Sequence, residues 1–124
     1  MYCSYCKSMS AASYCTTLTI LPHILIIILN RGRGKQFNVK CNFTEDLNLN
    51  NYCEFKNPPS NYKLIGVITH LGPSDMSGHF IAYCLDPIIK KWHRYNDSIV
   101  TDISDFRKEI VDSGSPYILF YQKL

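Results

Sequence analysis

The sequence contains no long hydrophobic run and no strong excess of charge of either sign. Its most apolar stretch, Ile24 to Leu29, spans six residues, whereas a membrane-spanning helix needs about 20. The formal net charge is +3, and the basic residues are scattered apart from one cluster at 31–35. A short basic turn of this kind is usually only a solvated loop. We therefore expect neither a membrane nor a nucleic acid among the partners.

The six cysteines do not have the density of a disulfide-stapled secreted domain. They are spread between residues 3 and 84. No signal peptide precedes them, because the first apolar run begins only near Leu18 and is interrupted at Pro22. We therefore expect free thiols in a reducing, intracellular compartment, the cytoplasm or the nucleus or both.

The residues that are present indicate one small β-rich domain. With 46% hydrophobic and 19% charged residues, 124 residues suffice for one modest core and are far from the composition of a disordered chain. Nine tyrosines and six phenylalanines favour cross-strand aromatic pairs. The fold class we expect is α+β, with one largely antiparallel sheet and one short helix near the C-terminus.

Apolar patterns predict strands along most of the chain. A short strand is expected from Leu18, then a break at Pro22, then a strand from Ile24 that is buried on both faces. Alternation predicts a half-buried strand at 35–43. The remaining predicted strands lie at 62–70, 79–86, 91–97 and 116–124.

The predicted helix lies in the sequence between the last two of these strands, 91–97 and 116–124. Ser104 is its candidate N-cap, and Phe106, Ile110 and Val111 have helical spacing. Gly114 stands where a helix-terminating glycine is common. Three other histidines, His23, His70 and His93, have no partner spacing and are expected to be exposed or packed.

His79 comes directly after a predicted flexible loop rich in glycine and serine, 72–78, and begins a predicted strand. If strands 79–85 and 92–97 form a hairpin with Tyr83 opposite Trp92, His79 faces Asn96, with Cβ atoms about 5 Å apart. A register shifted by one residue places Asp97 there instead. Either arrangement sets an oxygen acceptor beside the imidazole, as in the general-base half of a nucleophile–histidine–orienter triad. An ordinary packed or surface histidine is the alternative.

Several ordered motifs resemble the C-terminal portion of a ubiquitin-specific protease domain, a papain-like cysteine peptidase that removes ubiquitin. The resemblance spans roughly residues 3–124. The motifs are Leu21-Pro22 with the strand that follows, Ser77-Gly78-His79-Phe80, Ala82-Tyr83, Trp92 to Asp97, and Tyr117 to Tyr121.

The resemblance implies a role for each matching residue. His79 would be the general base and later the general acid, Asn96 the orienting residue, and Asp97 an assisting neighbour. The tail of ubiquitin ends in two glycines and needs close backbone approach. The residues expected to border its channel are Gly72, Ser77, Gly78 and Tyr83. The implied partners are ubiquitin and ubiquitinated proteins, with residues 18–124 as the palm-like part of the domain.

Residues 1–17 resemble a remnant of the zinc-binding fingers of the same family. Cys3 and Cys6, two residues apart, are a good half of a tetrahedral zinc site, but four ligands are needed. Cys15 could be a third ligand, although its spacing gives no support, and free cysteines are the alternative. The chemistry implied for His79 requires no cofactor.

The nucleophile of the family lies in a Gly-Asn-x-Cys-like box at the start of a buried helix, and no such box occurs in this sequence. Cys53 is the nearest imitation, but it precedes no predicted helix that could lower its pKa. Loss of a triad member costs orders of magnitude in rate, so we expect the chain alone to be inactive. Without the nucleophile-bearing thumb, we also expect the sheet face that bears His79 to expose apolar surface.

Three hypotheses for the function remain open. The first is the histidine-bearing part of a ubiquitin thioesterase or isopeptidase. The second is a truncated, non-catalytic ubiquitin-binding or interaction module. The third, a small zinc-binding interaction domain, depends only on Cys3 and Cys6.

Overall fold

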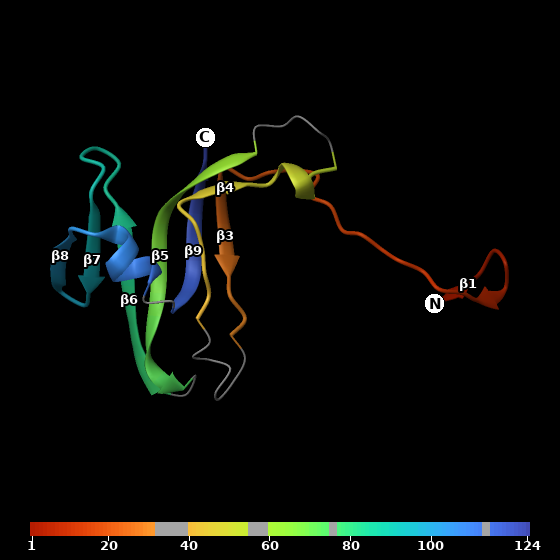
Figure 1. Cartoon of the computed structure of the whole chain (residues 1–124), viewed down its shortest axis with the longest axis horizontal. Helices are drawn as coiled ribbons and strands as arrows, with labels where there is room; N and C mark the ends of the chain where they lie inside the picture. The colour runs from red at the N-terminus through yellow and green to blue at the C-terminus, as the bar shows by residue number, and fades with distance from the viewer. Residues whose placement is uncertain (32–39, 55–59, 75–76, 113–114) are drawn as a thin grey trace.

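The computed structural model describes residues 1–31, 40–54, 60–74 (backbone alone at 73 and 74), 77–112 and 115–124. Its main feature is an antiparallel sheet of seven strands (Figure 1). Six of them follow the order β3-β9-β5-β6-β7-β8, and β4 pairs with β5 beside this path. The strands are β3 (Ile24–Ile28), β4 (Asp46–Asn48), β5 (Asn61–Ser74), β6 (Ser77–Leu85), β7 (Trp92–Asn96), β8 (Ile99–Ile103) and β9 (Pro116–Lys123).

The core lies on one face of this sheet, which we call the inner face. Alternate residues of a strand point to the same side. The buried apolar residues of β5, β6, β7 and β9 follow this alternation, apart from the irregularities in the pairing of β5 with β9. A single π-wound turn, η3 (Arg107–Val111), covers part of this face with fully buried Ile110. The buried apolar residues are Leu49, Tyr62, Leu64, Val67, Ile81, Tyr83, Trp92, Ile110, Leu119 and Tyr121.

Two buried tyrosine hydroxyls attach irregular segments to the inner face. The Tyr121 hydroxyl donates to the carbonyl oxygen of Thr44 at 2.7 Å, just before β4. The Tyr62 hydroxyl donates to the carbonyl oxygen of Pro22 at 2.7 Å, just before β3. Both hydrogen bonds let a phenol be buried without an unsatisfied polar group.

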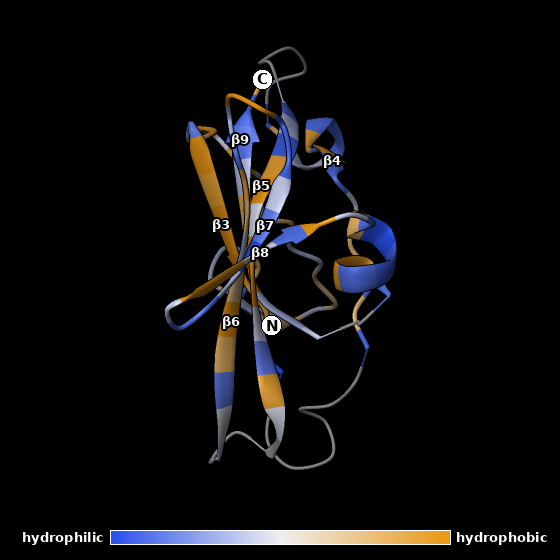
Figure 2. Cartoon of the chain, turned by 90° about the vertical axis from the view of Figure 1, so that its left-hand side faces the viewer, coloured by the Kyte–Doolittle hydropathy of each residue, from blue (hydrophilic) through white to orange (hydrophobic). Residues whose placement is uncertain are grey.

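The opposite, outer face of the sheet carries exposed apolar side chains. Figure 2 shows the sheet nearly edge-on, with η3 on one side only. On β3 the exposed fractions of Ile24, Ile26 and Ile28 are 44%, 54% and 66%. A shallow apolar groove of about 320 Å³ lies beside Gly66, which has no side chain to fill it. The outer-face residues, by register, are Ile24, Ile26, Ile28, Gly66, Ile68, His70, Phe80, Ala82, Cys84, His93, Tyr95, Val100, Asp102, Ile118, Phe120 and Gln122.

This arrangement corrects two expectations. The strand from Ile24 is not buried on both faces in this structure, because its described neighbours cover only the inner one. Most of the exposed apolar residues lie on the face opposite His79, since His79 shares the inner face with Ile81 and Tyr83. On the inner face, Leu71 and Ile99, which pair with His79 and Asn96, are 51% and 59% exposed.

Other predicted elements differ in their bounds. No strand forms at Leu18, which makes only an isolated bridge to Cys53. Residues 40–43 are not in a strand, and 32–39 lie outside the described residues. The small-residue segment before His79 is largely strand, because β5 continues to Ser74 and β6 begins at Ser77. Strand β8 was not predicted.

The antiparallel sheet is confirmed, while the C-terminal helix is reduced to η3. Asp105 rather than Ser104 caps it, because its Oδ1 accepts the Lys108 N–H at 3.0 Å. The Glu109 carboxylate reaches back to the backbone N–H groups of Ser104 and Asp105 at 3.3 and 3.4 Å. Gly114 lies outside the described residues. A single 3₁₀ turn, η2 (Asn50–Tyr52), precedes the segment at 55–59.

The N-terminal residues form a separate small hairpin, β1 (Tyr2–Cys3) and β2 (Ser8–Met9). Figure 1 shows it at the end of an extended segment, away from the sheet. Within the described ranges, no helix has the length and hydropathy needed to cross a membrane.

Candidate active-site residues

His79 and Asn96 form a hydrogen-bonded pair at one end of the inner face. His79 is the third residue of β6 and pairs with Leu71 of β5. Its Nε2 lies 2.5 Å from the Asn96 Oδ1 atom on β7. Since a carboxamide oxygen only accepts, the ring donates its Nε2 proton, and Nδ1 of the neutral ring is then an acceptor. The arrangement can therefore take up a proton at Nδ1 while the ring stays oriented.

The strand register that brings these residues together is not the predicted one. Tyr83 pairs with Arg94, and Trp92 pairs with Leu85, so β7 is displaced by two residues from the predicted alignment. A shift of two keeps every side chain on its face, whereas a shift of one would not. Asn96 is therefore a diagonal neighbour of His79, and such neighbours have backbones about 7–8 Å apart, within reach of polar side chains. The predicted contact is present for a different geometric reason.

Asp97 lies at the edge of the same site. Its Oδ2 is 3.7 Å from His79 Nε2, and its side chain is 79% exposed. It begins the short connection from β7 to β8 with a φ of +52°, a left-handed conformation that Asp tolerates better than most residues. Because an exposed ion pair is weakened by water and salt, Asp97 is the weaker of the two partners.

The small residues before His79 pack against their own hairpin. A methyl group on Gly72 would come within 2.7 Å of the Gly78 Cα atom and 3.1 Å of the His70 Cε1 atom. A methyl group on Gly78 would overlap the His70 ring. The structure thus requires glycine at both positions for internal packing, and Ser77 is exposed beside them. Their role in bordering a substrate channel stays a prediction.

Tyr83 differs from the other residues predicted to bind substrate. It lies in the core, 8% exposed, two residues beyond Ile81 on the inner face. Its contacts in the structure are therefore those of a core residue.

The structure describes all six thiols, and none of the hydrogen bonds that it shows for them involves His79. Cys53 follows η2 and donates to the carbonyl oxygen of Leu49 at 3.2 Å. Cys84 lies on the outer face, and burial raises the pKa of its thiol. None of the six cysteines forms a disulfide. The histidine half of a thiol–imidazole pair is therefore present without a thiol beside it.

Cys3 and Cys6 lie together in the N-terminal hairpin. The Ser8 hydroxyl, 3.1 Å from the Cys6 sulfur, is the main cause of a lowered pKa for that thiol, and Cys3 adds to the effect. A thiolate is the form that binds zinc. Among the described residues, however, no group of three or more histidines, cysteines or carboxylates is arranged to hold a metal. The two cysteines fit half of a zinc site and not a whole one.

Two histidines that the sequence left without partners have them in the structure. His93 Nδ1 lies 3.0 Å from the Asp102 Oδ1 atom across β7 and β8. His70 is 8% exposed and packs against Phe80 and Tyr117. The sequence could have indicated that His70 packs within its own hairpin, because it stands two residues before Gly72 in a strand that turns back. His93 could not, because β8 was not predicted.

Comparison with known proteins places these observations in a family. The family model described as ubiquitin carboxyl-terminal hydrolase matches residues 1–121. The chain is 32% identical over 127 residues to ubiquitin carboxyl-terminal hydrolase Usp2 of Drosophila melanogaster, and this alignment covers 98% of this chain and 13% of that protein. It is 32% identical over 126 residues to ubiquitin carboxyl-terminal hydrolase 2 of Gallus gallus, and this alignment covers 97% of this chain and 34% of that protein.

Solved structures agree in fold as well as sequence. A chain of the SAGA DUB module that contains Ubp8, bound to monoubiquitin, superposes with a TM-score of 0.83 at 30% identity. The alignment covers 100% of this chain and 28% of the other. The same module bound to ubiquitin aldehyde gives 0.80 at 29% identity, over 100% and 29% of the two chains. The chain thus spans between 13% and 34% of the length of the relatives named here.

Proposed function

Because this chain belongs to the ubiquitin carboxyl-terminal hydrolase family, we propose that it supplies the imidazole and the orienting carboxamide of a deubiquitinating active site. The chain is a ubiquitin-specific protease-like fragment in both sequence and fold. The observation that carries the proposal is the 2.5 Å contact between His79 Nε2 and Asn96 Oδ1. The proposed substrates are ubiquitin joined through its C-terminal tail to other proteins.

The proposed chemistry needs a thiol from a segment other than the six cysteines described above. That thiol gives its proton to Nδ1 of His79, and the thiolate attacks the carbonyl carbon of the last ubiquitin glycine. The imidazolium returns the proton to the leaving amine, so that the C–N bond breaks and a thioester remains. Water then attacks the thioester, with His79 accepting the proton of the water and passing it to the sulfur.

Asn96 and Asp97 have different parts in this scheme. The carboxamide oxygen of Asn96 holds the ring by accepting a hydrogen bond from the Nε2–H group throughout the cycle, and it does not change its own charge. The carboxylate of Asp97 favours the imidazolium from 3.7 Å, although water screens it. We therefore expect loss of Asn96 to harm the site more than loss of Asp97.

A ubiquitin probe with a thiol-reactive group at its C-terminus tests the assignment. We expect the chain to form no adduct by itself, because none of the thiols is hydrogen-bonded to His79. Nuclear magnetic resonance titration with unmodified ubiquitin should shift the signals of Ser77, Gly78 and His79. An adduct at any of the six cysteines, or a titration that shifts none of these signals, would contradict the proposal.

The separation of the thiols from His79 favours a second candidate, a non-catalytic ubiquitin-binding module. In both cases, replacement of His79 by alanine should leave the affinity for ubiquitin unchanged, also when a thiol-bearing partner segment is supplied. Only in the first case does that replacement abolish turnover in the complemented enzyme.

Three further assignments accompany the proposal. Residues 18–124 form the palm-like part and residues 1–17 a remnant of the fingers, which the separate β1–β2 hairpin supports. Zinc could bind Cys3 and Cys6 only if other ligands complete the site. The free cysteines support an intracellular location.

A further inference from the structure

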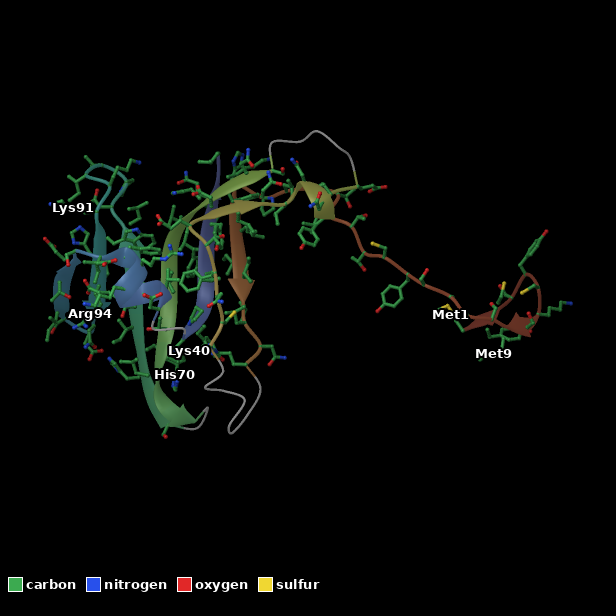
Figure 3. The ribbon with its side chains drawn as sticks, in the orientation of Figure 1. Met1, Met9, Lys40, His70, Lys91 and Arg94 are labelled. Carbon is green, nitrogen blue, oxygen red and sulfur yellow. The ribbon has the colours of Figure 1, made fainter. Side chains whose placement is uncertain are left out.

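The imidazole of His70 packs behind the hairpin that carries His79. It is 8% exposed and lies on the outer face, because its pairing partner Phe80 lies there. The two ring centroids are 4.8 Å apart, and Tyr117 of β9 lies 5.4 Å from Phe80. Figure 3 places His70 toward the end of β5 that leads into the hairpin tip. The ring is thus held between an aromatic pair and the tip of the hairpin.

Two glycines leave the space that this ring occupies. An added methyl group on Gly78 would overlap Cε1 and Nε2 of His70 and would lie 2.6 Å from the Leu71 carbonyl oxygen. One on Gly72 would lie 3.1 Å from Cε1 of His70. Such distances mean that the backbone of both strands rests directly on the imidazole where β5 and β6 converge.

The position of Gly78 links this packing to the active-site pair. Gly78 is bonded to His79, and successive residues of a strand point to opposite faces. The His70 ring therefore supports, from the outer face, the peptide unit from which the His79 side chain projects on the inner face. A 2.5 Å hydrogen bond between side chains of different strands requires that backbone to be held within about 0.5 Å.

We infer that His70 is a positioning residue, which packs beneath Gly78 and thereby keeps His79 within hydrogen-bond distance of Asn96. Its importance for deubiquitination depends on the proposed function, but the packing and its effect on His79 do not. The inference also assigns a second reason for glycine at 72 and 78: these residues make room for an internal imidazole and not only for a substrate tail.

The test is a double-mutant cycle on the full chain, with an isotope-labelled sample. The measured quantity is the nuclear Overhauser effect between the ring protons of His79 and the side-chain amide protons of Asn96. Because its intensity falls with the sixth power of distance, a displacement of about 0.5 Å lowers it by about half. We expect this loss in His70→Ala. Gly78→Ala should also lower the signal, and by more when His70 is present than when it is alanine.

His93→Ala is the matched control. It removes the same kind of ring from the same face of the sheet, on β7, which is separated from β5 by β6; the described partner there is Asp102 and not Gly78. We expect melting temperature to fall in this variant while the His79–Asn96 signal is kept. Equal loss of the signal in His70→Ala and His93→Ala would show a merely structural role and overturn the inference. Absence of the His79–Asn96 signal in the unmodified chain would overturn the inference as well. So would a loss of signal in Gly78→Ala that is the same whether residue 70 is histidine or alanine.

Ubiquitin titration of the unmodified chain separates the two proposals. If ubiquitin shifts no hairpin signal while the cycle shows coupling between His70 and Gly78, the proposed function fails and the positioning role stands. If ubiquitin binds and the coupling is absent, the positioning role fails alone.

Discussion

Replacement of Ile110 by alanine tests whether η3 closes the inner face that carries His79. Ile110 is 0% exposed and is the buried residue of a single turn. Its substitution removes methyl groups from a packed site, and such changes cost about 2–5 kcal/mol. A domain of this size has a total unfolding free energy of about 5–15 kcal/mol, so the loss is a large fraction of the whole.

The chain has its own reporter for this measurement. Trp92 is the single tryptophan, is buried, and stacks on Phe106 beside η3 with ring centroids 4.5 Å apart. Urea unfolding followed by its fluorescence therefore reports on the same part of the core. At roughly 2–8 °C per kcal/mol, the melting temperature should fall by at least several degrees.

Ile88→Ala is the matched control, because it makes the same chemical change at a residue that is 87% exposed in the β6–β7 connection. Its effect should stay within about 0.5 kcal/mol. Equal effects of the two substitutions, or an Ile110→Ala variant as stable as the parent chain, would refute the packing of η3 on the inner face.

Three more predictions follow from the sheet. The exposed outer face should drive self-association that rises with concentration in sedimentation velocity, and Ile26→Lys should weaken it; a monodisperse monomer at all concentrations would contradict this. Asn96→Ala should lower the unfolding free energy by about 0.5–1.5 kcal/mol, and Asp97→Asn, which removes the charge but keeps a residue that tolerates the positive φ at this position, by less; a larger effect at Asp97 would reverse the roles given to them. Burial raises the pKa of Tyr121 to about 12. Since an unfolded tyrosine ionises near pH 10, the raised pKa stabilises the fold below that pH, and this contribution is lost as pH rises through about 12. Tyr121→Phe should remove the last step of the phenolate absorbance titration, and an unchanged titration would count against a buried Tyr121.

The pairing of His79 with Asn96 could be anticipated from sequence, although the alignment used for it was wrong. The prediction set Tyr83 opposite Trp92, because aromatic pairs are common across strands. The structure sets Trp92 opposite Leu85 and stacks it on Phe106 instead. The error was two residues, which is the side-chain period of a strand, so the inward-facing residues stayed inward.

The burial of β3 could not be read from its sequence. A continuous run of isoleucine and leucine predicts a strand buried on both faces, but burial depends on what lies against each face. In the structure Leu25 and Ile27 pack on the core, while Ile24, Ile26 and Ile28 face outward. Similarly, η3 is shorter than the helical spacing of Phe106 and Ile110 suggests, and Ile110 is the one residue of this turn that is fully buried.

The sequence by itself determined the segments that form β3, β5, β6, β7 and β9, the faces on which their alternating residues lie, and the motif that contains His79, since these depend on local periodicity and residue type. Only the tertiary structure decided the β6–β7 register, the contact of His70 with Gly78, and the separation of every thiol from His79. These depend on how strands distant in sequence align, and an alignment is chosen by packing over the whole sheet rather than by any one segment.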